Sequence, residues 1–320
     1  MPRVVRGAIE LRARAPAKVN LVLRVGPLRG DGYHDLATLM VPLDLADEVV
    51  VEVDRGRDGE VTCRVPGRPE LDGASNLAAR AAEAFRQRFG LDDAVAIVVQ
   101  KRIPVTAGLG GGSSDAAAVI RALAHAYGVR DGGALAEVAL AVGSDVPFFL
   151  GSGAAWATGR GERLRPARVP PLQLVLAYPV DPGLAIRAGE AYRWLDASRQ
   201  GSAGRPRVPR PSSREFRPND AWNDLQAPCF DRHPPLRAIL GNLVGQGASA
   251  AIMSGSGPTV FGIFRDRGAA RRAAKAVQGV GSGNVQVFVV RTLQRQQGVS
   301  RWKSPRSASS RSTRRSSRPT

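Results

Sequence analysis

Residues 108–115 read Gly-Leu-Gly-Gly-Gly-Ser-Ser-Asp and lead directly into an alanine-rich stretch. Glycine has no Cβ, so four glycines within five residues let backbone N–H groups approach a ligand closely. The residues from 116 to 127 have helical spacing, and the start of a helix adds unpaired N–H groups and a partial positive charge. The sequence therefore predicts an anion site, most naturally for phosphate.

Two widespread nucleotide-binding loops do not fit this stretch. A Walker A loop ends in Gly-Lys followed by Ser or Thr, whereas no lysine follows the glycines here. A dinucleotide-binding fingerprint would need a third glycine at the position of Ser113. Taken alone, the segment is also compatible with a flexible turn capped by a serine.

Length and composition limit the classes of protein. The chain has 320 residues, enough for about two domains. It has no apolar run long enough to span a membrane and no signal-peptide pattern near its start, so we expect a cytoplasmic protein. Cys63 and Cys229 are too few for a disulfide framework, and together with three histidines they give no zinc spacing. We therefore predict no metal site built from protein ligands.

The net charge of +18 is concentrated in two segments. Residues 294–320 carry eight basic side chains and no acidic one, and residues 199–217 carry six arginines against Glu215. The segment 200–218 is rich in Gly, Ser, Pro and Arg and predicts a disordered insertion. The Ser/Arg-rich stretch from 294 predicts a disordered tail. These charges could bind polyanions weakly without defining the function.

Periodicity predicts the main elements. Alternating apolar residues indicate strands over 8–14 and 19–25, with Pro16 interrupting the ladder between them. Helical spacing indicates a helix over 116–127, for which Ser113 or Ser114 is the expected N-cap. The remaining predictions are strands over 49–53, 61–65 and 95–99, helices over 75–89 and 134–142, irregular backbone over 144–147, and a mixture of strands and helices beyond 166.

Phosphoryl transfer needs a group that positions the nucleophile and cations that neutralise developing charge. Asp145 follows the helix-ending Gly143 and is a candidate, although a helix cap is an equal alternative. Lys18 stands at the head of a strand, with Asn20 on the same face, although a surface lysine is the commoner reading. The motifs of serine hydrolases and protein kinases are missing.

Several segments together resemble a known family. The stretch from Pro104 to Asp115 resembles the phosphate-binding motif of the GHMP small-molecule kinases, which include galactokinase, homoserine kinase and mevalonate kinase. Within that superfamily, further segments resemble the kinases that act on 4-diphosphocytidyl-2-C-methyl-D-erythritol. These segments are 15–21, 30–34, 143–149 and 253–259. The resemblance extends in order from about Leu11 to Val290.

The resemblance implies an α+β, two-domain GHMP kinase fold. It comprises an N-terminal ribosomal-protein-like α/β domain over 1–165 and a C-terminal ferredoxin-like α+β domain over 166–293, followed by the tail 294–320. It also implies an ATP-dependent kinase of the non-mevalonate isoprenoid pathway, which phosphorylates the 2-hydroxyl of the methylerythritol unit. The active site is expected in the cleft between the two domains.

The resemblance also implies residue roles. Asp145 would be the catalytic base or orienter of the hydroxyl, and Lys18 would keep Asp145 ionised and stabilise the transferred phosphoryl group. Tyr33 and His34 would form the cytidine site, and Asn20 would help hold the substrate. ATP, accompanied by Mg²⁺, would bind Pro104, Val105, Thr106, Ala107, Gly108, Leu109, Gly110, Gly111, Gly112, Ser113 and Ser114.

One departure and two alternatives are part of the prediction. Arg187 and Ala188 stand where relatives commonly have Ser or Thr, which puts a polar substrate contact in doubt. A homoserine- or mevalonate-type kinase is the first alternative, although those substrates carry no base for Tyr33 and His34. A nucleic-acid-binding protein that uses the basic tail is the second. We expect small-molecule partners, no membrane and no specific nucleic acid, with monomer and homodimer both open.

Overall fold

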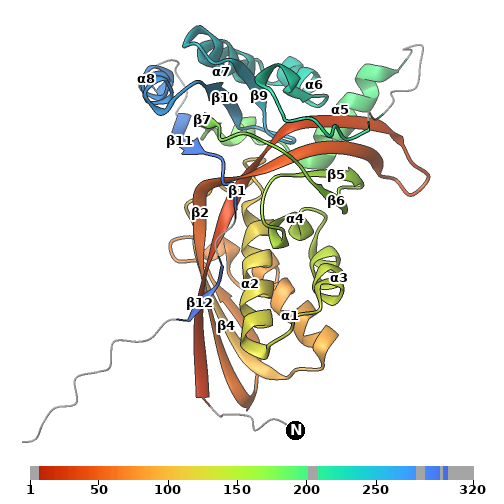
Figure 1. The fold of residues 1–320 in the computed structure, drawn as a ribbon, viewed down its shortest axis with the longest axis vertical. Coiled ribbons are helices and arrows are strands. Elements are labelled where there is room, and N and C mark those ends of the chain that lie inside the picture. The colour runs from red at the N-terminus through yellow and green to blue at the C-terminus, as the bar shows by residue number, and fades with distance from the viewer. Residues whose placement is uncertain (1–6, 201–207, 209, 279–284, 296–297, 302–320) are drawn as a thin grey trace, which may run out of the picture.

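The computed structural model describes residues 7–200, 208, 210–278, 285–295 and 298–301. These residues form two lobes, each a β-sheet with helices packed on it, stacked along the long axis of the molecule (Figure 1). The N-terminal lobe holds the larger sheet and helices α1 to α4, and the C-terminal lobe holds a four-stranded sheet and helices α5 to α8. The mixed α+β content agrees with the fold class predicted from the sequence.

Two long antiparallel strands, β1 and β2, run through the larger sheet and reach toward the other lobe (Figure 1). The strand order is β12-β1-β2-β4-β3, with β5 added to β2, β6 to β5 and β8 to β1. The strands are β1 (Gly7–Leu28), β2 (His34–Asp58), β3 (Val61–Arg64), β4 (Asp93–Gln100), β5 (Ala155–Gly159), β6 (Arg163–Pro166), β8 (Trp222–Asn223) and β12 (Ser300–Arg301).

The predicted interruption at Pro16 is wrong, because β1 is one continuous strand. Pro16 still pairs with Ala46, and the register shifts only between Pro16 and Lys18. A proline cannot donate to the ladder, and a local irregularity of this kind accommodates it without ending the strand. The shift lies immediately before Lys18, which pairs with Pro42 of β2.

Four helices cover one face of the larger sheet. Strand residues that alternate along β2, such as Val49, Val51 and Val53, are fully buried beneath them. Helix α2 is buried mostly through alanines, whose small side chains let it lie close to both α1 and the sheet. The helices are α1 (Leu77–Phe89), α2 (Gly111–Tyr127), α3 (Gly132–Val142) and the short α4 (Val146–Leu150).

Helix α2 begins earlier than the sequence predicted. Its N-cap is Gly110 in the left-handed conformation, and Ser113 and Ser114 lie in the first turn rather than capping it. Glycine adopts that backbone conformation without steric cost, and no side chain caps this helix start. The glycines therefore form the start of the helix itself. The expected irregular backbone at 144–147 is likewise wrong from Val146 onward, since α4 begins there.

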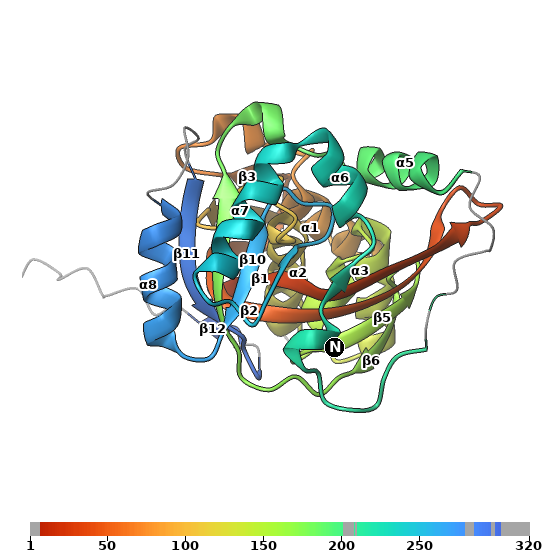
Figure 2. The ribbon, with the colours of Figure 1, turned by 90° about the horizontal axis from the view of Figure 1, so that it is seen from above.

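The C-terminal lobe contains an antiparallel sheet with the order β11-β7-β10-β9. Helices α7 and α8 lie over β10 and β11, as seen from above in Figure 2. The opposite side of the sheet contributes Leu174, Leu176 and Phe261 to an apolar cluster shared with β1 and β2. The elements are β7 (Gln173–Pro179), β9 (Ala250–Met253), β10 (Val260–Phe264), β11 (Val285–Arg291), α5 (Ala188–Arg199), α6 (Gln226–Arg232), α7 (Pro234–Gly245) and α8 (Arg267–Gln278).

The two segments predicted to be disordered lie partly outside the described residues, which leave out 201–207, 209, 296–297 and 302–320. Phe216 is buried and its N–H donates to the Arg168 carbonyl, so the prediction is wrong for this part of 200–218. Ser300 pairs with Arg12 in β1, so the tail prediction is wrong there as well. Within the described part of the chain, no helix is long and apolar enough to cross a membrane. The domain limits 1–165 and 166–293 stay predictions.

Candidate active site

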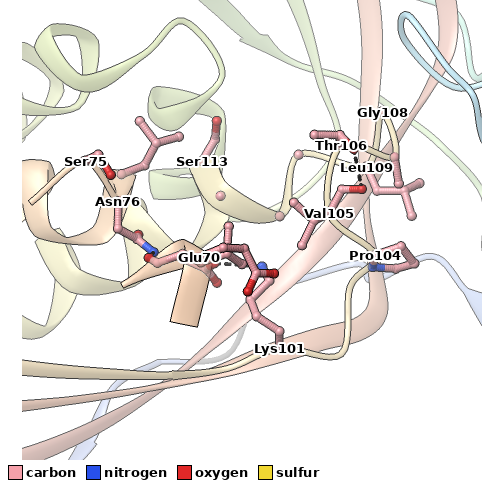
Figure 3. Close-up of a pocket in the computed structure, with 17 residues that line it drawn as sticks. Glu70, Ser75, Asn76, Lys101, Pro104, Val105, Thr106, Gly108, Leu109 and Ser113 are labelled. Atoms are coloured by element: carbon pink, nitrogen blue, oxygen red, sulfur yellow. Dashed lines mark hydrogen bonds and ion pairs between the residues drawn. The ribbon is translucent and has the colours of Figure 1, made fainter. Parts of the chain in front are cut away.

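A pocket of about 380 Å³ opens over the glycine-rich loop at the start of α2 (Figure 3). Ten of the eleven residues predicted to bind ATP line it, from Pro104 to Ser113. Ser114 is fully buried behind the loop and does not line the pocket. The loop and the first turn of α2 thus form one wall of the cavity, as an anion site at a helix start requires.

The opposite wall was not identified from the sequence. Ser75 and Asn76 face Pro104 and Val105 across the pocket (Figure 3). Asn76 caps α1 by accepting a hydrogen bond from the Ala78 N–H at 2.9 Å. In the sequence, this asparagine indicates only the start of a helix. Glu70 and Leu71, in a short 3₁₀ turn over Pro69–Leu71, and Leu77 complete this wall.

The glycine-rich loop contacts a second glycine-rich turn from the other lobe. A Cβ at Gly108 would lie 2.4 Å from the Ser254 carbonyl oxygen and 2.8 Å from that of Gly257. The Ser254 hydroxyl donates to the Gly108 carbonyl at 3.0 Å. Gly108 also has a φ of +73°, a conformation that favours glycine. Position 108 therefore requires glycine for two independent reasons, and the turn 254–257 belongs to the site.

Lys18 lies against the same loop and is only 5% exposed. Its backbone N–H donates to the Leu109 carbonyl at 2.9 Å, and its Nζ donates to Asn20 Oδ1 at 2.5 Å. The Asn20 amide nitrogen in turn donates to the Thr38 hydroxyl at 2.7 Å, which orients the amide oxygen toward the lysine. Lys18 and Asn20 thus share one face of β1, as their spacing predicted.

Asp145 completes the group at this end of the loop. It precedes α4, its side chain is 37% exposed, and its Oδ2 lies 3.6 Å from Lys18 Nζ. No described contact holds the carboxylate as a helix cap, since its side chain caps no N–H group of α4. The structure therefore brings together three of the predicted residues, Lys18, Asn20 and Asp145, from segments far apart in the chain.

His34 lies in a second, partly buried cluster. Its Nδ1 is 2.9 Å from the Gly26 carbonyl oxygen, and its Nε2 is 3.2 Å from Asp196 Oδ2. Its ring stacks on Tyr192, with centroids 5.3 Å apart and planes at 19°. Burial and the negative charge of Asp145 raise the pKa of the Tyr192 hydroxyl, so this cluster lies near Asp145.

The sequence did not identify Tyr192 or Asp196. They lie four residues apart on α5 and so share one face of that helix. That spacing is the one sequence signal that could have predicted that Tyr192 and Asp196 lie together, but it does not reveal which face of α5 meets His34. Arg187 and Ala188, the predicted departure from the family pattern, lie exposed at the start of the same helix.

Tyr33 is placed apart from His34, although the two are adjacent in sequence. It lies near the tip of the β1–β2 hairpin with half of its surface exposed. The Arg160 guanidinium lies 3.5 Å from the centroid of the Tyr33 ring. Tyr33 therefore borders the site rather than packing inside it.

Comparison with known proteins shows the family. Residues 76–155 match the model of the GHMP kinases N terminal domain, and residues 210–283 match that of the GHMP kinases C terminal. The 4-diphosphocytidyl-2-C-methyl-D-erythritol kinase of Anaeromyxobacter sp. (strain K) is 69% identical over 310 residues, covering 96% of this chain and 98% of the relative. The chain belongs to the 4-diphosphocytidyl-2-C-methyl-D-erythritol kinase family.

Solved structures support the same assignment. A crystal structure of a 4-(cytidine 5'-diphospho)-2C-methyl-D-erythritol kinase is 35% identical, covers 88% of this chain and 99% of its own, and has a TM-score of 0.67. A homoserine kinase from Cytophaga hutchinsonii has the same TM-score at 18% identity, with 94% and 99% covered, and so shares the fold. The predicted family and GHMP kinase fold are confirmed. The C-terminal match begins at residue 210 and therefore includes part of the segment 200–218.

Proposed function

We propose that this kinase transfers the γ-phosphoryl group of ATP to the 2-hydroxyl of 4-diphosphocytidyl-2-C-methyl-D-erythritol. The observation that carries the proposal is the group of Lys18, Asn20 and Asp145 at the end of the glycine-rich loop. A Cβ at Gly110 would lie 3.0 Å from Lys18 Cγ, so the loop and the lysine are in direct contact. A phosphate on this loop would therefore lie beside both a cation and a carboxylate.

The pocket suits ATP. The backbone N–H groups of the loop and of the first turn of α2 would hold the phosphates, and the partial positive charge of the helix start would favour them. The wall formed by Leu71, Asn76 and Leu77 against Pro104 and Val105 combines apolar surface with an amide, as a base-binding slot does. We assign the adenine to this part of the pocket.

Mg²⁺ would accompany ATP. Among the described residues, no three His, Cys, Asp or Glu side chains cluster as a metal site. Mg²⁺ commonly keeps several waters and is held by substrate phosphates with one or two carboxylates, so the residues present are compatible with it. Asp145, whose Oδ2 lies 3.6 Å from Lys18 Nζ beside the loop, could supply an oxygen ligand. When bound, the ion would neutralise charge on the phosphates.

Asp145 and Lys18 would act directly on the reacting groups. The acceptor oxygen attacks the γ-phosphorus, the bond to the β-phosphate oxygen breaks, and ADP leaves. Asp145 orients the acceptor hydroxyl and accepts its proton, for which a weak base is enough when the transition state is loose. Lys18, fixed by Asn20, stabilises the negative charge that spreads over the transferred group.

The cluster of His34, Tyr192 and Asp196 would bind the cytidine. Its rings offer stacking surface and its polar atoms offer hydrogen bonds, which suit a nucleobase. Homoserine and mevalonate carry no base that could use this cluster. Tyr33, on the β1–β2 hairpin, would contact the cytidine of the bound substrate from the edge of the site.

The test is an ADP-release assay with MgATP and three alcohols: the diphosphocytidyl substrate, homoserine and mevalonate. We expect turnover with the first alone. Asp145→Asn and Lys18→Met should each lower kcat by about 10²–10⁴-fold, because a base and a preorganised charge are removed. Lys275→Met, an exposed charge change on α8, is the matched control. Turnover with another alcohol would contradict the substrate, and near-normal kcat in both variants would contradict the roles.

A further inference from the structure

A second lysine lies behind the glycine-rich loop. A Cβ at Gly111 would lie 3.1 Å from Lys101 Nζ, so this cation is close to the first turn of α2. Its side chain is nearly buried, yet the residue lines the nucleotide pocket (Figure 3). The loop thus has Lys18 beside it and Lys101 behind it, although it lacks the lysine of a Walker A motif.

Two buried carboxylates hold Lys101. Its Nζ donates to Asp47 Oδ2 and, at 2.8 Å, to Asp115 Oδ2. Asp47 is fully satisfied, since its Oδ1 also accepts the N–H groups of Arg102 and Ile103. Asp115 is 3% exposed, and its Oδ1 has no hydrogen-bond partner among the described residues. Ionised, the three side chains would carry a net charge of −1 directly behind a phosphate site.

Asp115 is the group whose charge this arrangement disfavours. Burial is the main cause that raises its pKa to about 7; Lys101 lowers the pKa and Asp47 raises it. Burial opposes the charge of Lys101, but the two carboxylates prevail and its pKa is raised. Cys63 on β3 also faces Asp115, and burial, with Asp115 and Asp72, raises the pKa of its thiol to about 11. The neighbouring thiol is therefore neutral near pH 7.

We propose that Asp115 binds a proton when the phosphates of a nucleotide occupy the glycine-rich loop, and that Lys101 transmits this coupling. The inference rests on the proposed ATP site. Phosphates in the pocket add negative charge on the far side of Gly111, which further disfavours an ionised Asp115. Once Asp115 is neutral, the charge of Lys101 is balanced by Asp47 alone and acts more strongly on the phosphates. Asp115 and Lys101 are thus positioning residues for the nucleotide.

The consequence is proton-linked binding of MgATP. If binding raises the pKa of Asp115 by one unit from about 7, the Kd increases about sixfold between pH 6.5 and pH 8.5. Asp115→Asn places a neutral side chain of the same shape there, so it should keep tight binding and lose this increase. Lys101→Met should bind about tenfold more weakly and also show a flat profile, because an unpaired Asp115 stays protonated throughout.

The measurement is calorimetric titration with MgATP, without acceptor, from pH 6.5 to 8.5 in pairs of buffers with different ionisation enthalpies. The titration of ATP itself is common to all variants, so differences between them report Asp115. Near pH 7 the wild type should take up more protons than Asp115→Asn and Lys101→Met. Asp231→Asn and Lys275→Met, exposed matched changes, should behave like the wild type.

The outcomes separate this inference from the ATP site. Failure of the wild type to bind MgATP overturns both. Tight binding with the same pH slope and proton count in wild type and Asp115→Asn overturns the coupling alone. If Asp115→Asn does not fold, as judged by circular dichroism, the wild-type and Lys101→Met proton counts decide in the same way. Equal counts overturn the proposal, and a larger wild-type count supports it.

Discussion

Replacing Gly108 by alanine tests whether the two lobes meet through backbone contact at the phosphate loop. The new Cβ would lie 2.4 Å and 2.8 Å from two carbonyl oxygens of the turn 254–257, which is closer than real Cβ contacts. Gly128, at the C-terminal end of α2, is the matched control. It has nearly the same backbone conformation, with a φ of +70° against +73°, but no atom within 4 Å of its Cβ position.

The magnitudes follow from that difference. Both substitutions place an alanine in the left-handed region, which costs roughly 1–2 kcal/mol. Only Gly108→Ala also forces backbone apart, and overpacking of that kind typically costs about 1–3 kcal/mol. We therefore expect Gly108→Ala to lower the free energy of unfolding by about 2–5 kcal/mol and Gly128→Ala by about 1–2 kcal/mol. Movement of the loop should also weaken MgATP binding in the first variant alone.

Urea unfolding with linear extrapolation measures the stability difference, and titration with MgATP measures the affinity. Equal losses of stability, with unchanged affinity in both variants, would refute the reasoning, because the contact with Ser254 and Gly257 would then have no energetic weight. A larger loss of stability in Gly108→Ala than in Gly128→Ala, with weaker MgATP binding in Gly108→Ala alone, would show that the neighbouring lobe requires this glycine in addition to its own dihedral angles.

Two further predictions concern the acceptor site and the buried carboxylate. Tyr192→Leu should raise the KM for the diphosphocytidyl substrate about 10-fold, because a stacking surface is lost, and leave the KM for ATP unchanged. Steady-state kinetics measures both constants. A change in the KM for ATP alone would contradict the assignment of Tyr192 to the cytidine site. Asp115 has a raised pKa in the folded state, so the folded protein binds more protons than the unfolded chain between pH 4 and about 7. The free energy of unfolding therefore falls as pH rises through that range. This contribution of Asp115 to stability is at most about 4 kcal/mol. Unfolding experiments at pH 5.5 and 7.5 should show it in the wild type and not in Asp115→Asn. Parallel pH profiles of stability for the two proteins would contradict the prediction.

Local patterns predicted many of the elements. Alternation located the strands around 49–53 and 95–99, and helical spacing located α2, because side-chain periodicity is a property of a few neighbouring residues. The same reasoning failed at Pro16, where pairing with β2 kept the strand continuous. It also failed at Ser113, because Gly110 starts the helix without a hydroxyl cap.

In the site, too, the sequence revealed some residues and not others. The glycine-rich loop and the motifs around Lys18 and Asp145 could be recognised from residue types and order. Tyr192, within α5, and Asn76, the N-cap of α1, were missed, since the sequence around each shows a helix face or a cap and nothing of what lies opposite. The family resemblance assigned Tyr33 and His34 to one cytidine site, and the structure adds that Tyr33 is half exposed whereas His34 is buried.

By itself, the sequence determined which chemical groups are available: a loop of glycines that can bind phosphate, a lysine at the head of a strand, and an aspartate after a helix end. Only the tertiary structure decided which of these groups meet. The long β1–β2 pair places Lys18 against the loop at Gly110, and the turn after β9 closes over Gly108. The buried charges of Asp47, Lys101 and Asp115 came together in the same way. The physical reason is that backbone preferences act within a few residues, whereas contacts between distant segments, and the charges they bury, depend on how the whole chain packs.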